Sequence, residues 1–285
     1  MIKEILLPHD GSDHSASALQ YALSFAKALD AAITGLYVVD IVALEGPFLH
    51  DMSGSLGFEP YLNLSDKMRS VLEGRGALVM EGFASECKKA GVGFKTQISS
   101  GVVANEICGA ARLADLVVMG GRGVNAKFDY GLLGSVTEAV VRKSTAPVCV
   151  VPGVFELVKN PLLAYDGSPG ASSAMHSAAE IVKRLSLPLT VLTVVAADAV
   201  SGAASGEGEA LLKEAADYLK PYDITARFIR LQGEAALAIA NYYKEHCHDL
   251  IFMGASRRSR LVKLALGSVA EQVMRSVDGP FFMHR

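Results

Sequence analysis

Tryptophan is absent from this 285-residue chain, aromatic residues make up 7% of it, and cysteine occurs four times. The cysteines are scattered, with no Cys-x-x-Cys pair and no histidine at the spacing of metal ligands. This pattern excludes a disulfide framework and a zinc module, and it predicts no metal site. We expect reduced thiols, mostly buried, at Cys87, Cys108, Cys149 and Cys247.

An excess of charge of one sign is also missing, since 27 Lys and Arg stand against 30 Asp and Glu, with a formal net charge of -3. Without a basic run, nucleic acid is not an expected partner. No apolar stretch reaches the ~20 residues of a membrane helix, and residues 2–7 lack the layout of a signal peptide. We therefore expect a globular cytoplasmic protein that does not bind membranes.

What the sequence does contain is an internal repeat. Residues 5–12 return as residues 161–168, residues 114–120 as 248–254, and residues 134–136 as 267–269. Because the order is the same in both copies, we predict two tandem domains, 1–153 and 154–285.

The first copy is longer than the second by an insertion. The offset between matching segments falls from 156 residues at the first segment to about 134 at the later ones, which places some two dozen extra residues near 43–66. Glycines and prolines among apolar residues predict a long irregular stretch there. A lid, a loop that contacts a partner and a passive insertion all remain open.

Short apolar runs alternate with segments of helical period in each copy. Several runs are apolar on both faces, as strands of a parallel sheet covered by helices must be. We predict an α/β fold of two doubly wound parallel sheets, which pair edge to edge through residues 148–151 and 280–283. In the first copy we expect strands at 2–7, 31–39, 93–98, 115–119 and 147–151, and helices at 13–29, 65–90, 103–113 and 135–144.

A glycine-bearing loop leaves the strand at 115–119 and ends at the helix that begins with Ser135. Backbone N–H groups at a helix N-terminus favour an anion, and Arg122 or Lys127 can add charge. Gly120 and Gly123 let the main chain approach phosphate oxygens. The alternative is that the glycines only permit a turn and that Ser135 only caps its helix.

The order Asp-Gly-Ser at 10–12, Gly-x-x-Gly at 120–123 and Gly-Ser at 134–135 closely resembles the universal stress protein family, over nearly the whole chain and twice. The resemblance implies a tandem member with a Rossmann-like fold of the adenine nucleotide alpha hydrolase type. It implies ATP, with Mg²⁺ as its companion ion, in stress response or signalling. It also implies an intramolecular pseudo-dimer, with a homodimer or another protein partner left open.

The resemblance assigns Asp10 to ribose or a metal and Val38 to adenine, and it assigns the glycine loop to phosphates. One departure is that ten residues, rather than nine, separate Gly123 from Gly134. The implied site of the first half consists of Pro8, His9, Asp10, Val38, Met119, Gly120, Arg122, Gly123, Gly134, Ser135 and Val136.

The second half departs further, because Arg257 stands where the second glycine belongs. Its side chain either clamps a phosphate or fills the crevice, so we expect nucleotide mainly in the N-terminal half. The counterparts in this half are Asp166, Val194, Gly254, Arg257, Gly267 and Ser268.

These features favour a binding protein, and we assign no catalytic residues. Neither a Gly-x-Ser-x-Gly elbow nor a Walker Gly-Lys-Ser/Thr is present. At most we expect slow ATP hydrolysis, with His9 as a base, a sugar contact or a mere polar neighbour, and Asp10 serving binding rather than folding. The alternative function is a scaffold or regulatory partner-binding protein with degenerate pockets.

Overall fold

The computed structural model describes residues 1–41, 61–124, 133–196, 203–255 and 268–284. The first half contains β1 (Glu4–Pro8), α1 (Asp13–Leu29), β2 (Ala32–Asp40), α4 (Tyr61–Ala90), β3 (Phe94–Gly101), α5 (Val103–Ala110), η1 (Ala111–Leu113), β4 (Leu116–Gly120), α6 (Ser135–Lys143) and β5 (Val148–Val151). The second contains β6 (Pro161–Ala164), α7 (Pro169–Leu185), β7 (Leu189–Val195), α8 (Ala203–Leu219), η2 (Lys220–Tyr222), β8 (Ala226–Gln232), α9 (Ala235–Glu245), β9 (Leu250–Gly254), α10 (Ser268–Ser276) and β10 (Phe281–His284).

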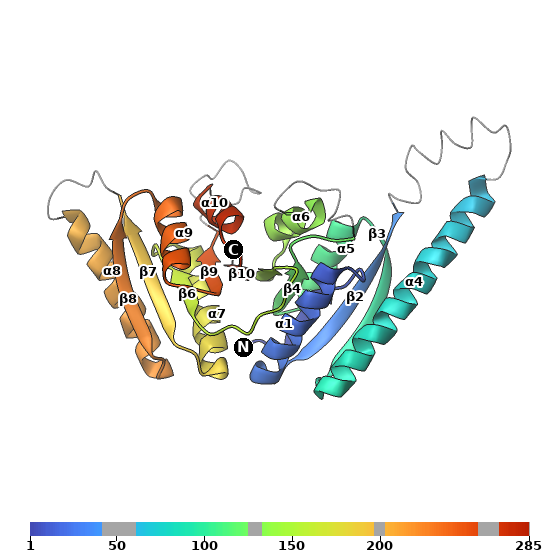
Figure 1. Ribbon diagram of the computed structural model, residues 1–285, viewed down its shortest axis with the longest axis horizontal. Helices are drawn as coiled ribbons and strands as arrows, with labels where there is room; N and C mark the ends of the chain where they lie inside the picture. Colours follow the sequence, from blue (N-terminus) through green and yellow to red (C-terminus); the bar gives the residue numbers. More distant parts are fainter. Residues whose placement is uncertain (42–60, 125–132, 197–202, 256–267, 285) are drawn as a thin grey trace.

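The strands form one ten-stranded sheet in the order β3-β2-β1-β4-β5-β10-β9-β6-β7-β8. Neighbouring strands are parallel within each half, and β5 and β10 pair antiparallel at the centre. The predicted edge-to-edge pairing is confirmed, with Phe282 opposite Cys149. The two halves therefore lie on either side of this seam, and α6 and α10 lie above it in the view of Figure 1.

Local sequence explains the helix starts that border the crevice. Ser12 precedes α1 and accepts a hydrogen bond from the backbone N–H of Ser15, and Ser168 caps α7 in the same way, followed by Pro169. The helix expected at 13–29 has these bounds in the structure. The predicted helix at 103–113 instead ends at Ala110 and continues as a 3₁₀ turn.

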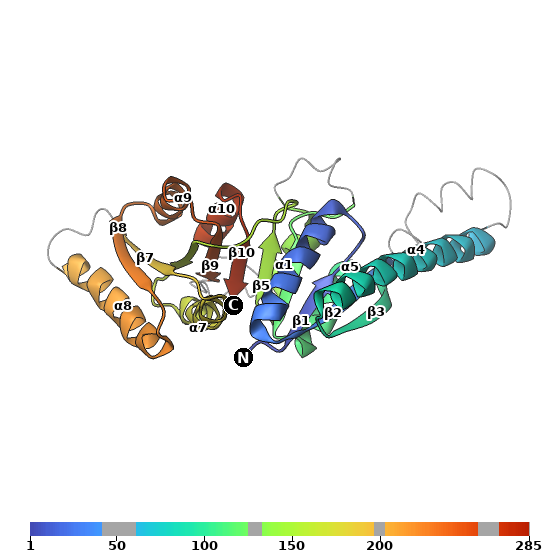
Figure 2. The same cartoon turned by 60° about the horizontal axis from the view of Figure 1, so that its bottom comes forward.

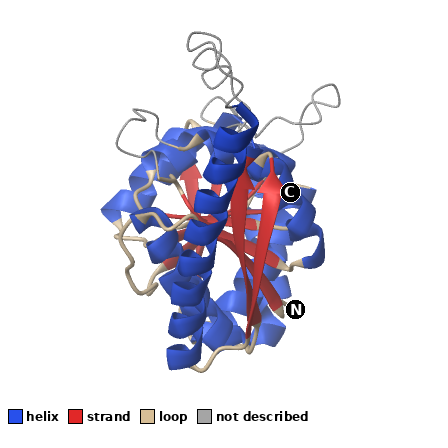
Figure 3. Ribbon diagram, turned by 90° about the vertical axis from the view of Figure 1, so that its right-hand side faces the viewer, coloured by secondary structure: helices blue, strands red, loops and turns tan. Residues whose placement is uncertain are grey.

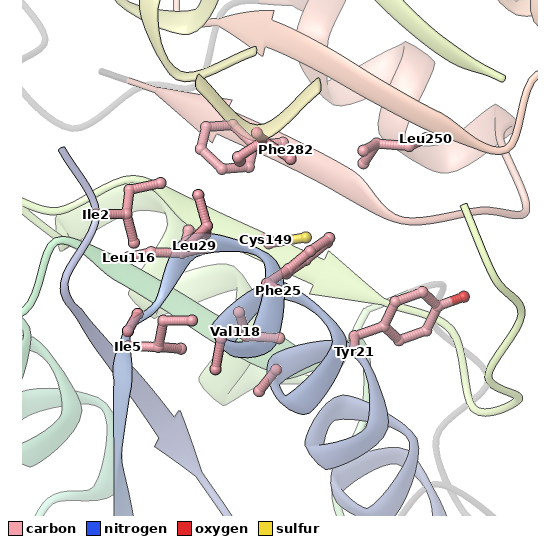
Figure 4. Packing of buried hydrophobic residues seen from close by; sticks show 14 of the residues in the cluster. Ile2, Ile5, Tyr21, Phe25, Leu29, Leu116, Val118, Cys149, Leu250 and Phe282 are labelled. Carbon is pink, nitrogen blue, oxygen red and sulfur yellow. The ribbon is translucent and has the colours of Figure 1, made fainter. Parts of the chain in front are cut away.

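Both faces of the sheet are covered by helices (Figure 2). Each face carries a hydrophobic core that runs across the seam. One core joins α1 and α4 to α7 and α8, and the other joins α5 and α6 to α9 and α10. In the first, Phe282 of β10 lies beside Cys149 and near Phe25 of α1 (Figure 4). The two halves therefore share their hydrophobic cores.

The insertion expected at 43–66 lies almost wholly outside the described residues, and only its end, from Tyr61, falls within α4. This helix has 30 residues, against 17 in α1, and it runs along the outside of β2 and β3 (Figure 3). Among the helices in the described part of the chain, none combines the length and the apolar character that a bilayer crossing requires.

Candidate functional site

A cavity of about 360 Å³ opens where β1, β2 and β4 end, at the carboxyl edge of the first half. This edge is the usual ligand crevice of open α/β sheets. The cavity brings together every residue that we proposed for the first half, namely Pro8, His9, Asp10, Val38, Met119, Gly120, Arg122, Gly123, Gly134, Ser135 and Val136. Residues from three strand ends and one helix start thus surround a single space.

Asp10 connects the end of β1 to the glycine loop. Its Oδ1 accepts the backbone N–H of Ser12 at 3.0 Å, and its Oδ2 accepts that of Val124 at 2.9 Å. Burial acts to raise the pKa of Asp10, but hydrogen bonds from Ser12, Ser15 and Val124 outweigh it and hold this pKa below its ordinary value. The carboxylate therefore ties two loops together, and we expect Asp10 to contribute to stability as well as to binding.

We expect Asp10→Asn to lower the free energy of unfolding by about 1–2 kcal/mol at pH 7, because a carboxylate that accepts two N–H groups is lost. Since folding depresses this pKa, the stabilisation is fully present above about pH 4 and disappears as the pH falls through the folded-state pKa. Urea unfolding at pH 7 and pH 3 measures the difference between parent and variant.

Asp166→Asn is the matched control for this experiment, because Asp166 also accepts the N–H of its Ser168 but lies on an exposed turn. Its effect should be the smaller of the two. An Asp10→Asn effect that is equally large at both pH values would contradict the assigned role of the carboxylate.

Close approach explains the glycines of the loop. A Cβ on Gly120 would lie 2.7 Å from the Cβ of His14, and one on Gly123 would lie 2.7 Å from Oδ2 of Asp10. Neither glycine has a positive φ, whereas Gly11 does, at 81°. A backbone turn with positive φ therefore does not explain why glycine occurs at positions 120 and 123. The close contacts do.

The start of α6 faces the cavity without a side-chain cap. Gly134 is the N-cap residue and makes no side-chain capping bond, so Ser135 does not cap this helix. Thr137 is buried and donates from Oγ1 to the carbonyl of Gly120, which holds the helix against the end of β4. The backbone N–H groups of the first helical turn and the positive end of the helix dipole make this position suitable for an anion.

His9 is a neutral imidazole here. Its Nδ1 accepts the backbone N–H of Gly11 at 3.2 Å and lies 3.0 Å from the Ser15 hydroxyl, so the ring proton is on Nε2. Burial lowers the pKa of His9, and the charge of Asp10 only partly opposes this. Because Nδ1 already has partners, His9 can orient a ligand through Nε2–H but is poorly arranged to accept a proton.

Several lining residues were not among our predictions. Two of them, Val103 and Ile107, lie one helical turn apart on α5, so their spacing was a usable signal for an apolar wall. Two others, Leu72 and Arg75, come from α4, and no motif marked them. The complete set of missed residues is Ser15, Leu36, Tyr37, Asp40, Leu72, Arg75, Val103, Ile107, Val124 and Thr137.

The corresponding edge of the second half is built differently. Tyr165 takes the position of His9, is buried, and donates its hydroxyl to Glu214 at 2.6 Å. A Cβ on Gly254 would clash with the backbone N of Ala171, so this glycine serves the packing of α7 on β9.

The remaining predictions for this half are placed only in part. Asp166 follows β6, Val194 lies in β7 and Ser268 begins α10. The predicted Arg257 and Gly267, and Lys127 of the first loop, lie outside the described residues.

Comparison with known proteins identifies the family to which the chain belongs. The model of the universal stress protein family matches residues 1–152 and 158–285. A universal stress protein of Synechocystis sp. is 29% identical over 294 residues, with 100% of both chains covered. A second, from Methanocaldococcus jannaschii, is 35% identical over 153 residues, which is 53% of this chain and 82% of that protein.

The fold has a solved counterpart along its whole length. The crystal structure of a universal stress protein from Archaeoglobus fulgidus matches with a TM-score of 0.72 at 25% identity, and it covers 99% of this chain and 98% of that one. Because the family model matches each half in turn, the repeat is a repeat of the family's own unit. The chain is therefore a tandem member of the universal stress protein family.

Proposed function

We propose that the chain binds an adenine nucleotide, ATP, in the cavity of its first half and acts in stress response or signalling. The observation that carries this proposal is the combination of an apolar wall, a carboxylate and an uncapped helix N-terminus around one space. These three features suit a base, a ribose and a phosphate chain in that order.

The apolar wall comes from the end of β2 and from α5. Leu36 and Val38 of the strand and Val103 and Ile107 of the helix line the cavity on this side. A flat aromatic ring gains from contact with such side chains, and backbone groups at Val38 can read its polar edge. We therefore propose this apolar wall as the adenine site.

The phosphate side is a cradle that only glycine permits. At Gly123 a Cβ would occupy the space beside Oδ2 of Asp10, so the backbone can approach a ligand where a side chain would fill the gap. Ser135 adds a hydroxyl and Arg122 adds a cation at the same side of the cavity. The residues present therefore fit a phosphate chain.

A magnesium ion would be held mainly by the phosphates. In the part of the chain that the structure describes, no three His, Cys, Asp or Glu residues form a group that could hold a metal. Asp10 and Asp40 line the cavity and can each supply one oxygen. The ion would neutralise phosphate charge, while this chain positions the nucleotide.

Two measurements test the proposal. The purified protein is denatured and the released small molecules are identified, and nucleotide-free protein is titrated with ATP by calorimetry. We expect adenine nucleotide in the released fraction and one site per chain. Protein that is fully folded but gives no heat with ATP would overturn the proposal and favour the scaffold alternative. Two equivalent sites would refute the assignment to the first half.

A further inference from the structure

The long helix α4 is held in a fixed register over the cavity. A Cβ on Gly76 would lie 2.6 Å from Cδ1 of Tyr37, so this turn of the helix is pressed onto β2. One turn later Val79 touches the turn after β1, since a Cβ on Gly11 would lie 3.0 Å from its Cγ2. Side chains next to these two contacts are therefore presented by a packed helix, not by a loop.

Arg75 immediately precedes the first of these contacts and lines the cavity. Its Nη2 donates to the carbonyl of Asp10 at 3.4 Å. Burial raises the pKa of Tyr37 and the charge of Arg75 opposes this, so the guanidinium also lies near that ring. Asp10 is thus contacted by α4 through its carbonyl and by the glycine loop, at Val124, through its carboxylate.

The sequence of the second half has a glutamate where the first half has Arg75. A Cβ on Gly167 would meet the side chain of Leu211 of α8, as one on Gly11 would meet that of Val79 of α4. A Cβ on Gly208 would meet Val195 of β7 and Arg230 of β8, where one on Gly76 meets Tyr37 of β2. Gly76 and Gly208 therefore correspond, as do Val79 and Leu211, each pair 132 residues apart. With this register Glu207 takes the place of Arg75.

We propose that Arg75 is a specificity-determining residue, a cation on α4 that makes this site select phosphorylated adenine compounds over adenosine. The inference rests on the proposed function and adds a second cation, from a different element than Arg122. Arg forms paired hydrogen bonds with phosphate oxygens, and its planar guanidinium loses less freedom per hydrogen bond than an ammonium group does. A glutamate at this position would repel the same ligand.

The test compares Arg75→Glu, which introduces the residue of the second half, with Arg69→Glu on the same helix. Arg69 is exposed and does not line the cavity, so this control changes the net charge equally. Calorimetry with ATP and with adenosine gives the affinity ratio of each protein. We expect Arg75→Glu to weaken ATP binding about 10- to 100-fold and adenosine binding by less than about twofold. The control should change neither affinity, and Arg75→Lys should keep only part of the ATP preference, because it keeps the charge but loses the paired hydrogen bonds.

The outcomes separate the two proposals. A parent protein that binds neither compound refutes the proposed function. If the parent binds ATP, two results would refute only the role of Arg75 and leave the proposed function standing. One is an unchanged ratio of ATP to adenosine affinity in Arg75→Glu, and the other is an equal decrease of that ratio in Arg69→Glu. Melting temperatures of all variants without ligand confirm that each protein is folded.

Discussion

Gly123→Ala should lower the affinity for ATP by about 100-fold, which corresponds to roughly 2.7 kcal/mol. The new Cβ would lie 2.7 Å from Oδ2 of Asp10, so the carboxylate must turn away and lose its hydrogen bond with Val124. The same methyl group would also fill the space where backbone approaches phosphate. One substitution thus disturbs both the ribose side and the phosphate side of the proposed site.

Gly121→Ala is the matched control, two residues away in the same loop. There a Cβ would meet its nearest neighbours at 3.6–3.7 Å, which is ordinary van der Waals contact. Calorimetric titration of both variants with ATP should separate them by at least tenfold. Equal affinities would show that close approach at Gly123 does not limit nucleotide binding.

Phe282→Ala should lower the free energy of unfolding by about 3–5 kcal/mol, in the range of large-to-small changes in protein cores. Its side chain is fully buried, and its ring centroid lies 5.0 Å from that of Phe252. Since it also lies beside Cys149, across the seam, the cavity would open in the core that both halves share (Figure 4).

Urea unfolding measures this loss, with Leu157→Ala as the control. Leu157 is 62% exposed in the segment that joins the halves, so its truncation should change stability by less than about 0.5 kcal/mol. If Phe282→Ala unfolds at the same urea concentration as the parent, the seam contributes little to stability and the halves fold as independent units.

The features that could be predicted from the sequence are those that a few adjacent residues encode. Double-sided apolar runs predicted the strands, and repeated segments predicted that Val148–Val151 and the C-terminal strand would face each other. Residues that directly follow a strand, such as Asp10 and Gly120, could be placed at one edge because carboxyl ends of parallel strands meet there.

The rest depends on how distant elements pack. Arg75 reaches the cavity only because Gly76 and Tyr37 fix the register of α4, and no local pattern encodes that contact. The reason for Gly123 was also hidden, because only the folded chain brings it against Asp10. At Asp10, the hydrogen bond with Val124 spans 114 residues, so this contact could not be inferred from the turn that contains Asp10.

The central pair of the seam has a consequence for symmetry. Val148 pairs with β4 in the first half in the same register as Phe281 pairs with β9 in the second half. The next residues, Cys149 and Phe282, are therefore equivalent positions in the two halves, and they lie opposite each other across the seam. In a dimer of identical single units, the residue on the twofold axis would have to meet its own copy, small against small or large against large. Covalent fusion removed that constraint, and a small thiol now accommodates a phenyl ring. The two halves expressed as separate chains should accordingly prefer each other to themselves.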